Sequence, residues 1–338
     1  MALYCGMDLH ANNVLVVLLD ENDKEVLRKR VCNDLGVIER TLAGYRSSIS
    51  GIAVESTYNW YWLVDGLEDL GYQMHLVNVA ATKQYEGLKF SDDNSDARWL
   101  AHLLRLGILP VGYIYPRKER AIRDLLRRRG SLVQQHTKNL LSVQSIICRT
   151  TGRRVNGNNV KKLSVEELSK GIKDQNILQA IRGNLSVMSC LKAEIKAIES
   201  SVTNQVKLRP EFKCLLTVDG IGRILSLTIM LETGDINRFP SVGNYSSYCR
   251  CVGSKKLSNG KKKGQGNRKN GNKYLAWAYI EAANFAIRYN DRARSFYQRK
   301  CSKTKRVIAT KAVAHKLARA CYCIMRDQVD FDETRAFA

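Results

Sequence analysis

Short runs of hydrophobic residues, separated by polar stretches, open the chain, a pattern typical of β-strands joined by turns. Apolar residues dominate 2–9 and 14–19, and the polar stretch 10–13 between them is typical of a turn. A third strand is predicted at 25–31, after another polar turn at 20–23. Because turns this short join neighbouring antiparallel strands, the pattern predicts a three-stranded antiparallel unit.

Helical spacing appears between the strands that follow. Short buried strands are predicted at 51–55 and 73–77, and apolar residues recur at helical intervals in 35–45, 58–70 and 95–106. The polar run 91–95 supplies several N-cap residues for the last of these helices. Three strands, a helix, and then strands and helices in alternation are the order of the ribonuclease H type of α/β fold.

Beyond Pro116 the apolar spacing becomes long and helical. Residues 117–148 carry apolar side chains along one seam, which Gly130 is expected to bend or weaken. Residues 165–206 continue the helical pattern, with near-heptad apolar intervals in 185–206. These stretches predict a helical hairpin or short coiled coil that serves as a dimerisation arm.

A second globular unit, mainly helical, is expected from Pro210 onward, with apolar helices at 224–231 and 274–289. A length of 338 residues is ample for two or three domains. The patterns predict a catalytic α/β domain at 1–150, a helical coiled-coil arm at 151–208 and a mainly α domain at 209–338.

Charge is distributed unevenly along these domains. Residues 1–100 hold 9 basic and 15 acidic residues, a net charge of −6, whereas the remaining 238 residues hold 46 basic and 17 acidic residues, a net charge of +29. A strongly basic surface is typical of proteins that follow the phosphate backbone of nucleic acids. An acidic N-terminal domain followed by a basic body therefore predicts nucleic acid as a partner.

Membrane and disulfide-based classes of protein are not favoured. No apolar run approaches the roughly 20 residues needed to span a bilayer, and the N-terminal sequence lacks the pattern of a signal peptide, which predicts a cytoplasmic protein without a membrane partner. Ten cysteines are scattered along the chain, and neither Cys249 and Cys251 nor Cys321 and Cys323 have the spacing of zinc ligands. Buried, reduced thiols are the favoured interpretation.

Four acidic residues stand where a metal site for phosphodiester chemistry would need them. Asp8 lies inside the first predicted strand, Glu55 ends a later strand, and Asp93 and Asp96 lie at the start of a predicted helix. Cleavage of phosphodiesters by hard cations such as Mg²⁺ or Mn²⁺ uses carboxylate oxygens as ligands. Asp93 has an alternative interpretation as a charge at a helix N-terminus. Asp8 and Glu55 fit a metal site better, because a carboxylate in an apolar strand is unfavourable without a partner.

Two segments of the basic body are typical of nucleic-acid contacts. The sequence Val-Asp-Gly-Ile-Gly at 218–222 is similar to the hairpin of a helix-hairpin-helix element, whose amides bind a phosphate, and fits a plain tight turn equally well. Residues 254–273 carry eight basic residues and no acidic residue, and they predict a flexible basic loop that folds on nucleic acid. The candidate nucleic-acid-binding residues are Arg123, Arg127, Arg128, Gly220, Gly222, Lys261, Lys262, Lys263, Arg268, Lys269 and Lys273.

Five short motifs occur along the chain in a specific order. They are Gly-Met-Asp-Leu-His at 6–10, Ala-Val-Glu-Ser-Thr at 53–57, Asp-Asn-Ser-Asp-Ala at 93–97, Ser-Asn-Gly-Lys at 258–261 and Lys-Asn-Gly-Asn-Lys-Tyr-Leu at 269–275. In this order they resemble the insertion-sequence one-ten family of transposases, which are DEDD recombinases related to the Piv DNA invertase. The resemblance covers nearly the whole chain.

This resemblance implies a Holliday-junction-resolvase-like N-terminal domain, a coiled-coil arm and a C-terminal transposase domain with a serine nucleophile. The implied catalytic residues are Asp8, Glu55, Asp93, Asp96 and Ser258. Asp92 stands beside Asp93 and leaves the register of the third acid open. Arg268 stands where the family commonly has a second serine, which favours Ser258 as the nucleophile.

The family uses a structured bridge RNA that pairs with both donor and target DNA. The resemblance therefore implies a prokaryotic recombinase, bound to DNA of the nucleoid, that exchanges strands through a phosphoserine intermediate as a dimer or tetramer. Two alternatives remain at this stage. One is a metal-dependent Holliday-junction resolvase or nuclease that hydrolyses with water, with Ser258 a solvated loop serine, and the other is a non-catalytic RNA-binding protein whose acids are structural.

Overall fold

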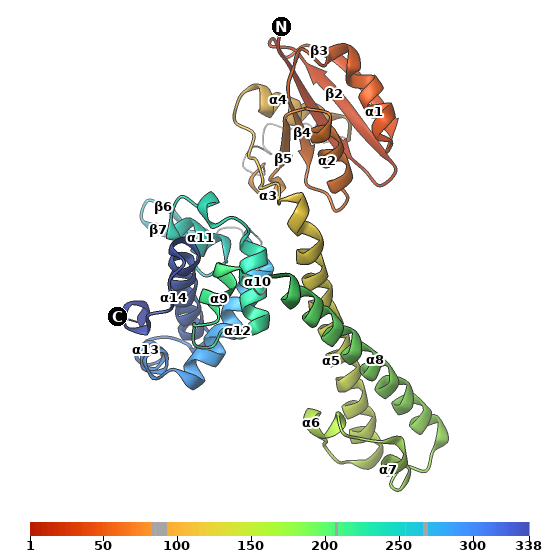
Figure 1. Ribbon diagram of the computed structural model, residues 1–338, viewed down its shortest axis with the longest axis vertical. Coiled ribbons are helices and arrows are strands. Elements are labelled where there is room, and N and C mark those ends of the chain that lie inside the picture. Colours follow the sequence, from red (N-terminus) through yellow and green to blue (C-terminus); the bar gives the residue numbers. More distant parts are fainter. Residues whose placement is uncertain (83–84, 86–92, 207–208, 254, 266–269, 338) are drawn as a thin grey trace. The chain divides into compact units, whose positions relative to one another are not determined.

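The computed structural model describes the chain except for residues 83–84, 86–92, 207–208, 254, 266–269 and 338. The chain forms two compact units, Met1–Arg117 and Lys118–Ala338 (Figure 1).

A five-stranded mixed sheet forms the centre of the first unit. Its strands are β1 (Leu3–Leu9), β2 (Asn13–Leu19), β3 (Glu25–Cys32), β4 (Ile49–Glu55) and β5 (Met74–Val77). Their order in the sheet is β3-β2-β1-β4-β5, in which β1, β2 and β3 are antiparallel and β1, β4 and β5 are parallel. The helices are α1 (Leu35–Leu42), η1 (Ala43–Tyr45), α2 (Tyr61–Asp69), α3 (Val79–Thr82) and α4 (Asp93–Arg105). The predicted α/β class is confirmed, with each predicted strand and helix within a few residues of its expected bounds.

Helices cover both faces of this sheet. Successive strand residues point to opposite faces, so Met7 packs with α1 and α2, whereas Leu15, Val17 and Leu19 pack with Ala97 and Ala101 of α4. Because β2 is covered on both sides, it is apolar along nearly its whole length rather than alternating. The result is a layer of helix, a layer of sheet and a second layer of helix (Figure 1).

Asp23 ties the β2–β3 turn to the second half of α4. Its carboxylate accepts hydrogen bonds from Arg98 at 2.7 Å and Arg105 at 3.1 Å, and its Oδ1 lies 2.6 Å from His102 Nδ1. Partial burial raises the pKa of Asp23, but the hydrogen bonds and charges of His102 and Arg98 lower it by more, so the net pKa lies below its ordinary value. These contacts fix α4 on the sheet.

The second unit contains a helical arm made by α5 (Arg117–Thr151) and α8 (Gln175–Val206), with α6 (Gly157–Val160) and α7 (Val165–Ser169) between them. Near one end, Ile146 and Ile147 of α5 pack with Leu178 and Ile181 of α8. At the other end, the beginning of α5 and the last turns of α8 join the core of the C-terminal helices. The two long helices therefore form an antiparallel hairpin (Figure 1). The helix α5 continues through Gly130 without interruption.

The rest of the second unit is mainly helical around one apolar core. Its elements are α9 (Pro210–Leu215), α10 (Arg223–Thr233), η3 (Ile236–Arg238), α11 (Val242–Tyr248), β6 (Lys255–Ser258), β7 (Lys261–Gln265), α12 (Lys273–Tyr289), α13 (Asp291–Cys301), α14 (Arg306–Asp327) and α15 (Glu333–Phe337). None of the described helices combines the length and the apolar character needed to cross a membrane.

All ten cysteines are free thiols, as predicted. The expectation that they are buried holds for Cys5, Cys249, Cys251 and Cys321, and burial raises the pKa of the Cys251 thiol to about 12. It is wrong for the cysteines at 32, 148, 190 and 323, which are exposed. The spacing of the cysteines did not distinguish buried from exposed thiols, because a thiol is tolerated on both the buried and the exposed face of a helix or strand.

Candidate active site

Gly6 lets α4 lie directly on β1. A Cβ atom at Gly6 would come within 1.9 Å of the Ala97 carbonyl oxygen and 2.7 Å of the Ala101 amide nitrogen. Toward the N-terminal ends of the same strands, a Cβ at Gly51 of β4 would lie 3.6 Å from Leu104, which is near the end of α4. The helix therefore runs antiparallel to β1 and β4, and its N-terminus lies toward the C-terminal ends of these two strands.

We expect Gly6→Ala to lower the free energy of unfolding of the first unit by about 3 kcal/mol, because overpacking against backbone atoms cannot be relieved by a side-chain rotation. Denaturant titration of the full-length protein measures this change. Gly44→Ala is the matched control, since a Cβ at Gly44 meets no described atom within 4 Å. Equal unfolding midpoints for the two variants would show that α4 does not rest on Gly6.

Asp8, next to the last residue of β1, and Glu55, the last residue of β4, lie side by side on adjacent parallel strands. The strand register joins Met7 of β1 to Val54 of β4, so the next residue on each strand is one of the two acids. Register neighbours on parallel strands point to the same face, with the strands about 4.8 Å apart. Asp8 is also opposite Leu15 of β2, which packs on α4. Both carboxylates therefore belong to the face that α4 covers.

Asp96 lies near the same edge of the sheet. It directly precedes Ala97, the residue that rests on Gly6, and it is partly buried. Since α4 runs antiparallel to β1, the helical residues before Ala97 lie toward the end of β1 that carries Asp8. The structure thus brings Asp8, Glu55 and Asp96 to one edge of the sheet.

Asp93 is the first residue of α4, about one turn before Asp96. Its backbone is helical, but its side chain lies outside the described part of the structure, and Asp92 lies wholly outside it. The choice between these two acids as the third member of the set stays a prediction.

His10 is a neighbour of Asp8 that sequence reasoning did not single out. Its Nε2 atom lies 2.9 Å from Asp8 Oδ2. Its carbonyl oxygen accepts hydrogen bonds from Asn33 at 3.0 Å and Asn59 at 3.1 Å, which hold the chain in place after β1. Its position two residues after Asp8, on the same side of an extended chain, was the available sequence signal.

This set of carboxylates fits a divalent metal ion by the chemistry of its donors. The Asp8 side chain is only 6% exposed, and a second, partly exposed acid, Glu55, lies on the same face of the sheet, so negative charge gathers at this edge. A hard cation such as Mg²⁺ would offset this charge and accept carboxylate oxygens as ligands. Among the described side chains, which exclude that of Asp93, no three His, Cys, Asp or Glu residues form a complete metal-binding group.

Ser258 belongs to the second unit, whereas the four acids belong to the first. It is exposed at the end of β6 and pairs with Lys261 of β7. Asn259 and Gly260 connect the strands with positive φ angles of 49° and 70°, as a two-residue hairpin turn requires. The predicted flexible loop at 254–273 is therefore wrong over β6 and β7, which form a hairpin. The Asn-Gly pair was the sequence signal for it.

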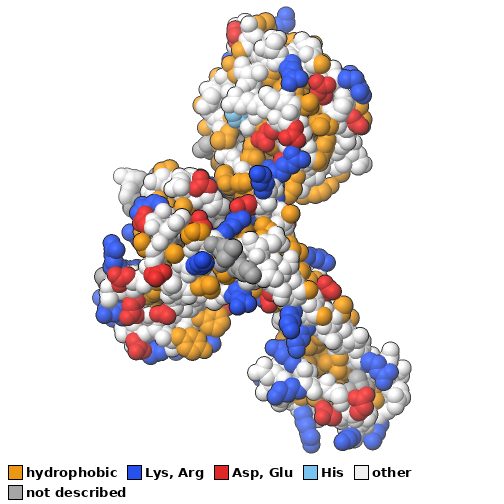
Figure 2. All heavy atoms as spheres, in the orientation of Figure 1, with side chains coloured by type: hydrophobic (Ala, Val, Ile, Leu, Met, Phe, Trp, Pro, Cys, Tyr) orange, Lys and Arg blue, Asp and Glu red, His pale blue; other side chains and the backbone are white. Residues whose placement is uncertain are grey.

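The candidate basic residues of α5 differ in environment. Arg128 is exposed, whereas the Arg123 side chain is only 11% exposed and its Nε lies 3.6 Å from Asp124. Arg127 forms an ion pair with Glu232. Further along the arm, basic side chains are exposed at 149, 153, 154, 161 and 162. Figure 2 shows Lys and Arg side chains on the surface of the arm.

The candidate lysines after Ser258 extend along the hairpin. Lys261 and Lys263 of β7 and Lys273 at the start of α12 are exposed. The side chain of Lys262, and Arg268 and Lys269 entirely, lie outside the described residues.

Gly220 and Gly222 lie in the turn between α9 and α10. Gly220 has a φ of +89°, and a Cβ there would come within 2.6 Å of the Ala282 carbonyl oxygen, so packing on α12 requires glycine. Gly222 is exposed and is the N-cap of α10, and no described atom lies within 4 Å of its Cβ position. Gly220 has a structural role in the turn, while Gly222 leaves space at the start of a helix.

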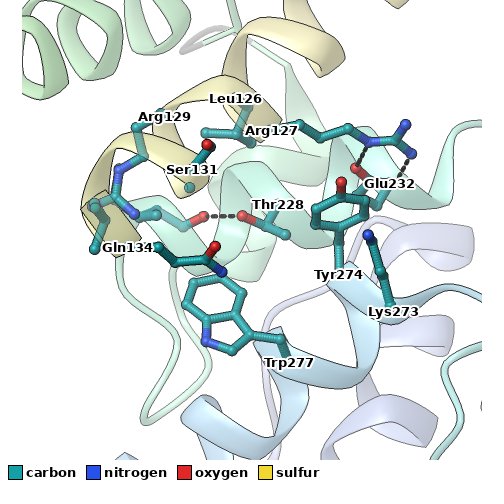
Figure 3. Close-up of a pocket in the computed structure, with 13 residues that line it drawn as sticks. Leu126, Arg127, Arg129, Ser131, Gln134, Thr228, Glu232, Lys273, Tyr274 and Trp277 are labelled. Carbon is teal, nitrogen blue, oxygen red and sulfur yellow. Dashed lines mark hydrogen bonds and ion pairs between the residues drawn. The ribbon is translucent and has the colours of Figure 1, made fainter. Parts of the chain in front are cut away.

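Glu232 forms a buried polar cluster that sequence reasoning missed. Its side chain is 2% exposed and accepts two hydrogen bonds from Arg127, at 2.6 and 2.7 Å, and one from Asn272 at 2.7 Å (Figure 3). Burial lowers the pKa of Arg127, but the hydrogen bonds and charge of Glu232 raise it by more. Asn272 also caps α12 by accepting from the amides of Tyr274 and Leu275. The cluster joins α5, α10 and α12.

Comparison with known proteins finds matches to two regions of the chain. Residues 5–150 match a family of DEDD transposases of the IS110 type, and residues 212–298 match the family described as Transposase IS116/IS110/IS902. A protein of Sinorhizobium fredii, y4qE, provisionally described as a transposase, is 23% identical over 296 residues, which cover 84% of this chain and 73% of that protein. The transposase for insertion sequence element IS1533 of Leptospira borgpetersenii is 28% identical over 134 residues, which cover 38% of this chain and 39% of that protein.

The two matched regions define a DEDD transposase, an enzyme that cleaves and rejoins DNA. The chain belongs to the IS110 family of transposases, the insertion-sequence one-ten family that its motifs resemble.

Proposed function

We propose that this transposase exchanges DNA strands through a phosphoserine intermediate at Ser258, assisted by Mg²⁺ held by Asp8, Glu55, Asp93 and Asp96. The observation that carries the proposal is the position of Asp8 and Glu55 as register neighbours on the face covered by α4. The strand order of the sheet supports a ribonuclease H-like, resolvase-like fold for the N-terminal domain.

In the proposed reaction, the Ser258 hydroxyl oxygen attacks the phosphorus of a DNA phosphodiester. A bond forms between the serine oxygen and phosphorus, the bond to one deoxyribose oxygen breaks, and the serine proton ends on the departing oxygen. A hydroxyl of the second DNA then attacks the phosphoserine, which restores Ser258 and joins the strands. A divalent cation bound by the four acids would offset the negative charge that develops on the phosphate.

The exposed position of Ser258 suits this role, since a nucleophile for DNA must reach a large substrate. Lys261 is its register partner on β7, Lys263 follows two residues later, and both add positive charge that attracts phosphates. We further propose that a bridge RNA selects donor and target DNA by base pairing, and that the protein contributes backbone contacts. The arm of α5 and α8 is the proposed contact between copies in a dimer or tetramer.

Metal removal tests the proposed chemistry. The protein, copurified with RNA from its host, is incubated with DNA that carries the ends of its insertion element, and strand cleavage is followed on denaturing gels. We expect cleavage with Mg²⁺, loss of at least about 100-fold of the rate after chelation, and recovery with Mn²⁺. Cleavage at the same rate without a divalent cation would contradict the metal assignment.

A further inference from the structure

A cavity of about 510 Å³ lies between α5, α10 and α12 of the second unit (Figure 3). None of the proposed catalytic residues lines it. Its volume falls within the range of roughly 300–1,000 Å³ that is typical for sites of small molecules. The cavity is large enough for one nucleotide and too small for a base-paired helix.

Aromatic rings from α12 form one wall of the cavity. Trp277 is 46% exposed, although it is the largest side chain of the helix, and the Tyr274 ring precedes it by about one turn. Figure 3 shows the Trp277 indole next to Gln134 of α5. A partly exposed flat ring at the wall of a cavity offers a stacking surface for another flat ring.

Hydrogen-bonding groups stand close to this ring. The side-chain amide of Gln134 has an NH₂ group that donates hydrogen bonds and a carbonyl oxygen that accepts them. No described residue forms a hydrogen bond with this side-chain amide. Thr228, in contrast, already donates its hydroxyl to the Ile224 carbonyl oxygen at 2.8 Å. Glutamine amides pair with the edges of bases, adenine above all.

The charge of the lining favours an anion. Three basic residues and one acid line the cavity. Arg127 is held by Glu232 and Arg129 by Glu199, at 2.6 Å in each case. Lys273 has no carboxylate within ion-pair distance among the described residues and is exposed. Its ammonium group is therefore available to a phosphate.

We propose that this cavity binds one unpaired nucleotide of a single-stranded nucleic acid, with the base stacked on Trp277, its edge at Gln134 and its phosphate near Lys273. The proposal rests on the transposase function and adds to it a site for an unpaired base. Strand exchange exposes such bases in the DNA, and a guide RNA contains them as well.

Two measurements on the full-length protein test the site. First, single-stranded DNA and RNA oligonucleotides that contain 5-iodouracil are cross-linked by ultraviolet light and the modified residue is mapped by mass spectrometry. We expect the cross-link at Trp277. Second, we expect Trp277→Ala to weaken binding of single strands by about 5- to 100-fold, the loss of one base stack, while duplex DNA binds as before. Tighter binding of the DNA or of the RNA strand identifies the source of the nucleotide.

Phe285→Ala is the matched control. Phe285 is 40% exposed on the same helix and does not line the cavity, so its removal is expected to leave affinity within about twofold of the wild type. Trp277→Phe should keep most of the affinity, because a stacking ring remains. Wild-type affinity of Trp277→Ala, equal losses in the two alanine variants, or cross-links only at other residues would overturn the proposal. Cleavage that depends on Mg²⁺ is measured separately, so failure here is distinguishable from failure of the proposed function.

Discussion

Ser258→Ala is expected to abolish covalent adducts between the protein and DNA while the protein still folds and binds nucleic acid. Without the hydroxyl oxygen no bond to phosphorus can form at this position, so the adduct should fall below detection. Ser258 is an exposed residue at a hairpin turn, and its replacement should change the free energy of unfolding by no more than about 0.5 kcal/mol. Adducts are counted after denaturation of reactions with labelled DNA.

Ser302→Ala is the control for this experiment. Ser302 is another exposed serine of the second unit, whose hydroxyl donates to the Arg299 carbonyl oxygen at 2.9 Å. The Ser302→Ala variant should form as many adducts as the wild-type protein. Adducts that persist in Ser258→Ala would assign the nucleophile to another residue. Full cleavage without any adduct in the wild type would favour the alternative of a nuclease that uses water.

Asp8→Asn is expected to slow strand cleavage by at least about 100-fold without destabilising the fold. Asp8 is nearly buried beside Glu55, so loss of its charge removes a ligand of the proposed metal ion but also relieves repulsion between the two acids. The free energy of unfolding in the absence of divalent cations should therefore stay the same or rise. Cleavage assays and denaturant titration measure the two effects on the same preparation.

Glu39→Gln is the matched control for Asp8→Asn. Glu39 belongs to α1, on the other face of the sheet, and its nearest cation is Arg46 at 3.9 Å. Its replacement should leave the cleavage rate unchanged. If Asp8→Asn cleaves at the wild-type rate and unfolds more readily, the acid is structural and its contact with His10 at 2.9 Å stabilises the fold.

The strands and helices of the first unit could be predicted because their signals are local. The apolar runs of β1 and β2 between polar turns, and the helical spacing in α1 and α4, depend on each segment's own residues. Asp8 and Glu55 were recognisable for the same reason, since each carboxylate follows an apolar run. Their position side by side was not recognisable from these runs alone, because it depends on β1 and β4 pairing across more than forty residues.

Contacts between distant segments explain most of what the sequence left open. Arg127 was predicted as a nucleic-acid ligand, yet its partner Glu232 lies 105 residues away. The β6–β7 hairpin was missed for a different reason, because its many lysines suggested a solvated loop and outweighed the Asn-Gly turn signal. The cavity at Trp277 depends on three helices meeting and has no local signature.

The residue that carries DNA in the trapped adduct decides whether Ser258 is the nucleophile and whether the acids are needed for its reaction. Wild-type protein is incubated with RNA, Mg²⁺ and DNA that carries the ends of its insertion element, then denatured, digested and analysed by mass spectrometry. We expect a nucleotide joined through phosphate to Ser258, formed only with Mg²⁺ and absent from Asp8→Asn. An adduct on another residue, or one that forms equally in Asp8→Asn, would contradict it.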